Sequence, residues 1–123
     1  MPHNKPKYTL FKNASYALSG LIEVIKNETS FQIELFFMLL MGVVAIFLPI
    51  SFGYKAILLI SLLVPLMAEL ANSAIERVVD LVTKEYHILA KHAKDAGSAL
   101  VLVSIITTTL VWITVLLLAF NIV

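Results

Sequence analysis

Three carboxylates and one amide lie along a single face of a predicted helix. In the stretch AELANSAIERVVD, at positions 68–80, Glu69, Asn72, Glu76 and Asp80 are three or four residues apart. Residues at these spacings share a face of an α-helix, so the four side chains form one polar stripe. The twelve residues that precede the stretch, AILLISLLVPLM, are almost entirely apolar. The stripe therefore begins within a segment typical of a membrane interior.

Glu69 is the deepest of these carboxylates and the first candidate for chemistry. A charged group at the centre of a bilayer costs at least about 2.5 kcal/mol, so such groups face a protein interior or a water-filled cavity and are functional by default. A carboxylate at that depth can accept a proton from a reacting group. Glu76 and Asp80 lie nearer the water interface, where polar contacts between helices, or emergence into water, are the alternative to function. For Asp80 this alternative explains the residue as well as function does.

A second acidic group opens the first apolar segment. The stretch NETSFQIE, at positions 27–34, carries Glu28 and Glu34. The helix dipole alone explains an acid such as Glu28 near a helix N-terminus. Glu34 lies one turn into the apolar run and therefore needs a polar partner or water.

The polar segment at 83–95 carries the remaining candidates, and a solvated loop is the simple explanation for it. Lys94 and Asp95 come immediately before an apolar run, and a helix N-terminus with a nearby lysine favours anions. Carboxylates, an imidazole and backbone oxygens suit a hard cation such as Mg²⁺ better than a soft metal. The candidates in this segment are Glu85, Tyr86, His87, Lys91, His92, Lys94 and Asp95.

Several familiar chemistries are excluded by composition. The chain has no cysteine, so it has no disulfide, no thiolate nucleophile and no cysteine metal site. It contains no glycine-rich phosphate loop, no GxSxG and no HExxH motif. Phosphate handling would therefore need carboxylate-bound metal and basic side chains. The net charge of +1 points to neither nucleic acid nor another acidic partner.

The elements that position these residues are predicted to be membrane helices. Of the 123 residues, 60% are hydrophobic and 14% charged, whereas soluble domains are about half apolar and a quarter charged. Apolar runs predict spans over 31–48, 54–82 and 96–120, with a cytoplasmic loop over 83–95. Pro65 removes the donor for the carbonyl group of Ser61 and predicts a kink.

An amphipathic helix is predicted over 8–27, ahead of the first span. Its apolar residues recur with a helical period, and beside membrane spans such a helix lies in the interface. We expect no cleavable signal peptide, because the first apolar run begins only after a long polar segment. The fold class is therefore an all-α membrane protein with one surface helix and three transmembrane helices.

The basic residues predict the orientation in the membrane. Of the nine lysines and arginines, only Lys55 lies by the first turn, and the others precede the first span or surround the second connection. Basic residues accumulate on the cytoplasmic side. The N-terminus and the 83–95 loop are therefore predicted to be cytoplasmic and the C-terminus to be outside. All eight acidic residues also lie on the cytoplasmic side or in the inner half of a span.

One protomer is too small to enclose the polar stripe. Three helices barely surround a site, so carboxylates on one of them would face lipid on some side. Packing against further copies of the chain would bury these groups. We therefore expect a homo-oligomer with shared sites.

These motifs together resemble a known family. AELANSAIERVVD, followed by EYHILAKHAKDAGSA at 85–99, resembles the small prokaryotic diacylglycerol kinases, and NETSFQIE fits the start of their first span. The resemblance covers nearly the whole chain. It implies a homotrimeric helical bundle in the bacterial inner membrane, with active sites between protomers at the cytoplasmic interface. The implied reaction passes the γ-phosphoryl group of MgATP to the hydroxyl of diacylglycerol and gives phosphatidic acid.

The resemblance also implies roles for the matching residues. Glu69 would be the general base on the lipid hydroxyl, and Glu28 and Glu76 would hold the metal and, through it, ATP. The other nucleotide contacts would be Tyr16, Asn72, Glu85, His87, Lys94 and Asp95. The lipid contacts would be Glu34, Glu69, Ser98 and Trp112.

The chain departs from the family pattern at one position, and one member of the stripe has no implied role. Thr9 stands where the family often carries an arginine that reaches the site, and Lys7 or Lys12 could substitute for it. Asp80 receives no role from the residues or from the resemblance.

Two other functions remain open from the sequence. Spacing alone does not separate diacylglycerol from undecaprenol as the lipid substrate, although the acidic NETSFQIE segment resembles the diacylglycerol branch. A different class is an ion- or proton-translocating oligomer, because a glutamate within a span can carry protons. The confinement of the carboxylates to one half of the spans argues against a path across the membrane.

Overall fold

Five helices make up residues 9–123, the part of the chain that the computed structural model describes. They are α1 Leu10–Asn27, α2 Thr29–Phe47, α3 Phe52–Ser61, α4 Leu63–Val82 and α5 Ile88–Ala119. The described residues form no strand. Three helical segments are long and apolar enough to cross a membrane: α2, the pair α3 and α4, and α5. The predicted all-α class with three candidate spans is therefore confirmed.

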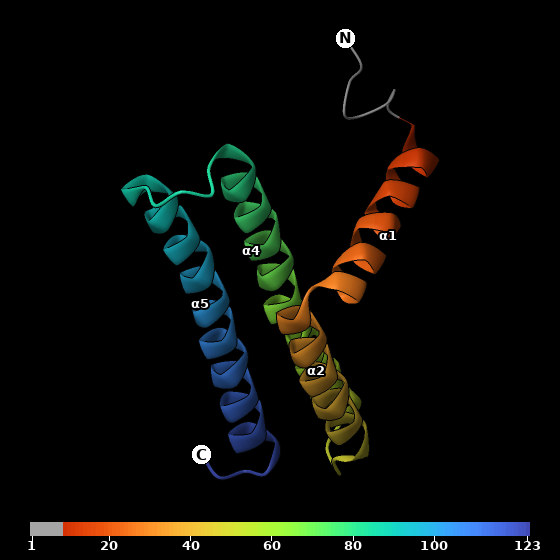
Figure 1. The fold of residues 1–123 in the computed structure, drawn as a ribbon. Coiled ribbons are helices and arrows are strands. Elements are labelled where there is room, and N and C mark those ends of the chain that lie inside the picture. The colour runs from red at the N-terminus through yellow and green to blue at the C-terminus, as the bar shows by residue number, and fades with distance from the viewer. Residues whose placement is uncertain (1–8) are drawn as a thin grey trace.

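The helices α4 and α5 pack side by side and antiparallel along most of their length (Figure 1). Helix α2 lies against α3 and α4, and α1 turns away from the bundle at an elbow next to Glu28. The connection between α4 and α5 lies at the same end as α1, whereas the C-terminus lies at the opposite end.

The helix is interrupted one turn before Pro65, where the sequence predicts a kink. The helix breaks at Leu62, between α3 and α4, three residues before the proline. The carbonyl oxygen of Ser61, which has lost its donor to the proline, accepts a hydrogen bond of 3.1 Å from the hydroxyl of Thr108 on α5. Hydrogen bonds between membrane helices contribute about 0.6 kcal/mol on average and up to about 1.7 kcal/mol. The break in the helix thus allows a hydrogen bond between α3 and α5.

The polar connection after α4 is shorter than the predicted 83–95. Helix α5 begins at Ile88, eight residues before the predicted span, and only 83–87 are non-helical. Nδ1 of His87 caps the new start by accepting from the backbone nitrogen of Leu89 at 3.2 Å. The residues over 88–95, ILAKHAKD, are half apolar and half polar, and most of them are good helix formers. Apolar content therefore located the membrane-like part of the helix but not its first two turns.

The surface helix α1 begins at Leu10, and Thr9 caps it by accepting from the backbone nitrogen of Lys12 at 3.3 Å. Most of its large apolar side chains are exposed, Ile25 is half-buried, and Val24 is its one buried residue within the described chain. This exposed apolar face fits a helix that lies in a membrane interface. Lys7 lies outside the described residues.

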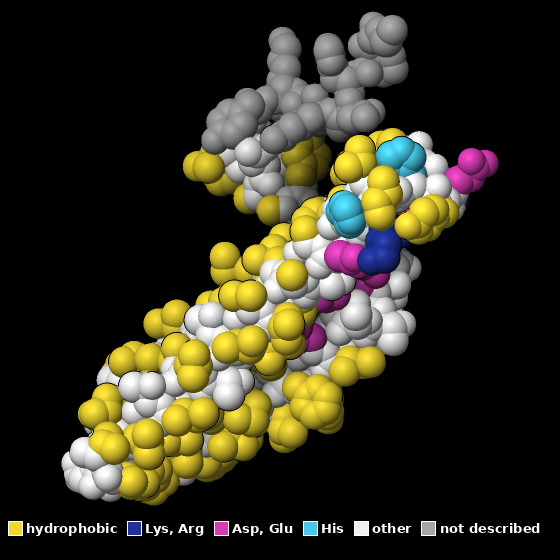
Figure 2. Space-filling view, turned by 90° about the vertical axis from the view of Figure 1, so that its left-hand side faces the viewer, with side chains coloured by type: hydrophobic (Ala, Val, Ile, Leu, Met, Phe, Trp, Pro, Cys, Tyr) yellow, Lys and Arg dark blue, Asp and Glu magenta, His cyan; other side chains and the backbone are white. Residues whose placement is uncertain are grey.

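Buried residues of the bundle gather where α2, α3 and α5 meet. The core cluster consists of Ala45, Leu58, Leu62, Trp112 and Val115. Hydrophobic side chains also cover most of the outer surface seen in Figure 2, away from the end that carries the charged residues. This exposed apolar surface has to meet lipid or other copies of the chain.

Candidate active site

The polar stripe of α4 runs from a buried to an exposed position. Glu69 and Asn72 are only 6% and 7% exposed, Glu76 is half-buried and Asp80 is exposed. Acidic, basic and histidine side chains gather toward one end on the face in Figure 2. Depth along α4 therefore separates a protected carboxylate, Glu69, from the carboxylates of Glu76 and Asp80, which water can reach.

A hydroxyl from α2 holds the buried carboxylate of Glu69. Ser30 Oγ donates to Glu69 Oε1 at 2.6 Å, so the other oxygen, Oε2, remains for a further partner. Glu34 on the next turn of α2 lies close enough for its charge to interact with that of Glu69. Its Oε2 is buried and has no hydrogen-bond partner among residues 9–123. Two acids and a serine thus converge where α2 meets α4.

The amide of Asn72 lies between Glu76 and helix α5. Its Nδ2 donates to Glu76 Oε1 at 3.4 Å, and its Oδ1 is buried without a partner among the described residues. A Cβ atom added at Gly97 would lie 2.3 Å from this Oδ1. Gly97 therefore makes the room that Asn72 occupies. Sequence reasoning missed both Ser30 and Gly97, because their roles depend on how separate helices cross.

Two ion pairs organise the end of α4 and the start of α5. Lys94 Nζ lies 2.6 Å from Asp80 Oδ1, and Lys91 Nζ lies 2.5 Å from Asp95 Oδ2. A surface cavity of about 500 Å³ opens here, and among its lining residues are Asp80, Glu85, His87, Lys94 and Asp95. Asp80, which had no role from the sequence, links α4 to α5 through Lys94.

Glu28 lies at the elbow between α1 and α2. Arg77 on α4 donates to its Oε1 through Nη2 at 2.8 Å and through Nε at 3.2 Å. The Nη1 atom of Arg77 lies 2.5 Å from Glu23 Oε2 on α1. One guanidinium therefore joins the surface helix, the elbow and α4.

The charge state of Glu23 follows from this contact. Hydrogen bonds from Arg77 and then Asn27 lower the pKa of Glu23 from its ordinary value of 4.5. A lowered pKa means that the pair stabilises the attachment of α1 at pH values above 4.5. This contribution is lost as the pH falls through the lowered value, so the pair is intact at neutral pH.

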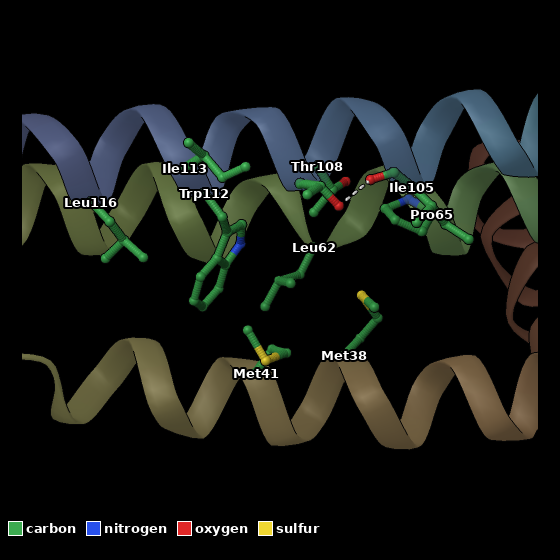
Figure 3. A pocket seen from close by; sticks show the side chains of 10 residues that line it. Met38, Met41, Leu62, Pro65, Ile105, Thr108, Trp112, Ile113 and Leu116 are labelled. Carbon is green, nitrogen blue, oxygen red and sulfur yellow. Dashed lines mark hydrogen bonds between the residues drawn. The ribbon is translucent and has the colours of Figure 1, made fainter.

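The remaining candidates lie apart from the stripe. Tyr16 is exposed on α1, and Ser98 is exposed on α5 beside Gly97. Trp112 lies fourteen residues further along α5, which corresponds to about 21 Å at the rise of an α-helix. It lines an apolar cavity of about 250 Å³ in which Met38 and Met41 of α2 face it (Figure 3). Its Nε1 is buried without a partner among the described residues.

The chain is similar in sequence to known proteins over most of its length. The model of the prokaryotic diacylglycerol kinase family matches residues 15–116. The chain belongs to this family. It is an ATP-dependent lipid kinase and a membrane protein with three apolar helices.

Several curated members of the family are similar over most of their length. The diacylglycerol kinase of Escherichia coli K12 is 38% identical over 113 residues, which cover 91% of this chain and 93% of that protein. The enzyme of Pseudomonas aeruginosa is 38% identical over 102 residues, covering 83% of each chain. The enzyme of Helicobacter pylori 26695 is 35% identical over 111 residues, covering 90% of this chain and 87% of that protein.

The oxygen groups near the stripe fit a magnesium ion that arrives with ATP. Residues 9–123 contain no group of three or more acidic or histidine side chains placed to hold a metal by themselves. Magnesium usually binds through one or two carboxylates together with substrate phosphates and water. Half-buried Glu28 and Glu76 would supply hard carboxylate oxygens, and the Nδ2 atom of Asn72 donates to Glu76. This donor set suits a metal–nucleotide complex better than a permanently bound ion.

Proposed function

We propose that the protein transfers the γ-phosphoryl group of MgATP to the primary hydroxyl of diacylglycerol and produces phosphatidic acid. Family membership and the names of the curated relatives support the lipid substrate. The observation that carries the mechanism is the buried Glu69 carboxylate, which a hydroxyl holds on one oxygen. Such a group suits the removal of a proton from an alcohol inside a membrane protein.

Glu69 takes the proton of the lipid hydroxyl in this proposal. Ser30 donates to Oε1, so Oε2 is left for the acceptor alcohol. Phosphoryl transfer depends mainly on alignment and on neutralising the charge of the phosphates, with one residue receiving the hydroxyl proton. When bound, Mg²⁺ supplies part of that neutralisation.

Carboxylates and cations at the cytoplasmic end hold the nucleotide. Glu28 and Glu76 would hold the metal, and Asn72 keeps Glu76 in place through its amide. Lys94 faces the phosphates from the start of α5. Glu85, His87 and Asp95 are further nucleotide contacts, and their place in the lining of the cavity of about 500 Å³ supports this assignment. Tyr16 on α1, outside that lining, is the last nucleotide contact in this proposal.

The acyl part of the lipid meets the apolar end of the bundle. The cavity next to Trp112 is lined by Met38, Met41 and Leu62 and suits a hydrocarbon chain (Figure 3). Ser98 and Glu34 lie nearer the polar stripe and contact the polar part of the lipid. The lipid thus lies along α5 with its hydroxyl toward Glu69.

The site faces the cytoplasm and lies between copies of the chain. The distribution of lysine and arginine supports a cytoplasmic N-terminus in the bacterial inner membrane and an outer C-terminus. In this proposal the chain assembles into a homotrimer with shared sites, as the family resemblance implies, because the three helices of one chain do not enclose the polar stripe of α4. Chemical crosslinking of active membranes is expected to give trimers, and recovery of monomers alone would contradict this assembly.

Glu76→Gln is expected to raise the Mg²⁺ concentration for half-maximal activity by at least about tenfold, because a neutral amide binds the cation more weakly than a carboxylate. The KM for diacylglycerol should change little, since Glu76 does not contact the lipid in this proposal. The measurement is a Mg²⁺ titration at saturating lipid. An unchanged Mg²⁺ dependence would remove Glu76 from the metal site.

A competition assay tests the lipid substrate. Purified protein in mixed micelles receives MgATP with equal amounts of diacylglycerol and undecaprenol, and the two phosphorylated lipids are separated. Phosphatidic acid is expected as the main product. If undecaprenyl phosphate were the main product, the protein would still be a lipid kinase, but its substrate would be undecaprenol and not diacylglycerol.

A further inference from the structure

Arg77 connects three parts of the protein that no other described ion pair joins. Its guanidinium bonds Glu23 on α1 at 2.5 Å and Glu28 at the elbow at 2.8 Å, while its own backbone belongs to α4. Arginine presents its donors in a rigid planar fork, so one side chain can fix two carboxylates at defined angles. A lysine would donate from one nitrogen only and so would not match the three bonds that Nε, Nη1 and Nη2 make at separate positions.

Glu28 needs such a contact because its backbone is not helical. Its φ of −107° and ψ of 106° are extended, and it separates α1 from α2. Packing between α1 and α4 is also loose beside the elbow. A cavity of about 330 Å³ lies between the two helices, lined by Gly20 and Val24 on one side and by Leu70 and Arg77 on the other. Arg77 is therefore the main polar constraint on the direction of the Glu28 carboxylate.

Arg77 is also next to the other proposed metal ligand. It follows Glu76 directly, and successive helix residues point about 100° apart. Glu76 accordingly turns toward Asn72, while Arg77 reaches the elbow. One turn of α4 thus carries Glu76, which is one proposed metal ligand, and Arg77, which holds Glu28, the other proposed ligand.

The combined charge of Arg77, Glu28 and Glu23 still favours the binding of a cation. Arg77 beside Glu28 alone would cancel the charge that attracts a metal ion. Glu23 adds a second carboxylate to the same guanidinium, so the three groups together retain one negative charge. Both bonds to Glu28 end on Oε1, which leaves Oε2 for a metal–nucleotide complex.

We propose that Arg77 is a positioning residue of the phosphoryl-transfer site: held by Glu23, it sets the Glu28 carboxylate for the metal–ATP complex. This inference rests on the proposed function, in which Glu28 binds the metal. Glu23 then also helps to position the Glu28 carboxylate, through Arg77, although it touches neither metal nor nucleotide.

Binding of Mn²⁺ with a non-hydrolysable ATP analogue tests this role without turnover. Electron paramagnetic resonance of the purified full-length protein gives the dissociation constant of the metal–nucleotide complex. Arg77→Gln is expected to raise this constant about tenfold, the lower end of the effect seen when partners of metal ligands are removed. Adding Glu23→Gln to Arg77→Gln should have little further effect, because residues that act as one unit are not additive.

Lys26→Gln is the matched control. It removes the same charge from the end of α1, where the side chain is exposed, but it leaves the Arg77 contacts intact. Its effect is expected to stay below about twofold, as for isolated surface charges. Should Arg77→Gln fail to fold by circular dichroism, Arg77→Lys and Glu23→Gln are measured instead, and both should weaken binding more than Lys26→Gln.

Two results would overturn the inference. Binding by the folded Arg77 variants equal to that of Lys26→Gln would remove Arg77 from the site. Additive effects of Arg77→Gln and Glu23→Gln would show that the two residues act separately. The activity of the unmodified protein distinguishes the failures: if it phosphorylates lipid while Arg77→Gln binds normally, the inference alone fails. If it phosphorylates no lipid, the proposed function fails, whatever the Mn²⁺ titration gives.

Discussion

Glu69→Gln is expected to lower kcat by about 10²- to 10⁴-fold, the usual contribution of a general base. Glutamine has nearly the same shape as glutamate and can still accept the hydrogen bond from Ser30. It cannot take a proton from the lipid hydroxyl. The change therefore removes proton transfer and leaves the arrangement of α2 and α4 in place.

Nucleotide binding separates this effect from a general loss of structure. The dissociation constant of Mn²⁺ with the ATP analogue should remain close to that of the unmodified protein, because Glu69 lies deeper along α4 than the proposed metal ligands. Steady-state kinetics in mixed micelles give kcat. Retained turnover in Glu69→Gln would take the role of base away from this residue.

Gly97→Ala is expected to lower both activity and stability, with a destabilisation of about 1–3 kcal/mol, as for overpacked interiors. Its Cβ would lie 2.3 Å from Asn72 Oδ1 and 3.3 Å from Asn72 Cγ. The amide would have to move, and its bond to Glu76 would be disturbed. Because α4 and α5 pack closely along their length, the backbone has little room to yield.

Other glycines of the same chain provide matched controls. A Cβ at Gly53 would meet no atom within 4 Å, and one at Gly42 would make ordinary contacts of 3.8 Å. Alanine at these positions should leave activity nearly unchanged. Thermal unfolding in detergent and the lipid kinase assay are measured for all three variants, and for Gly97→Ala combined with Asn72→Ala.

The double variant identifies the clash as the cause. Removing the Asn72 amide makes room for the new methyl group, so Gly97→Ala with Asn72→Ala should recover stability while activity stays low. If Gly97→Ala had the same thermal stability and activity as Gly53→Ala, the close approach of α5 to Asn72 would contribute to neither.

Patterns within one helix were readable from the sequence. The spacing of Glu69, Asn72, Glu76 and Asp80 placed them on one face of α4, and their graded exposure follows from the passage of that helix out of an apolar segment. The break after α3 followed from Pro65, which removes one backbone donor. Each of these inferences needs only local geometry and composition.

Contacts between helices were not readable in the same way. Ser30 reaches Glu69 across thirty-nine positions, and Thr108 reaches the Ser61 carbonyl across forty-seven. Nothing in the type or spacing of these residues separates them from other polar side chains in apolar helices. The clearest available signal was Arg77, because a charged residue directly after a candidate metal ligand has to find a partner.

The start of α5 shows a second limit of sequence reasoning. Apolar content placed the span at 96, but the helix begins at Ile88 and carries Lys91, Lys94 and Asp95 on its first two turns. The ion pair between Lys94 and Asp80 depends on that helical extension. Hydropathy reports where a helix meets lipid, whereas capping by His87 sets where the helix starts.

Transfer of radioactive phosphate from γ-labelled MgATP into lipid tests the central proposal most directly. Purified protein in micelles containing diacylglycerol should move the label into phosphatidic acid, with one ADP formed for each labelled lipid. Glu69→Gln, measured in parallel, should leave the label in ATP. Label that stayed in ATP with the unmodified protein, or appeared only as inorganic phosphate, would contradict the proposed diacylglycerol kinase reaction.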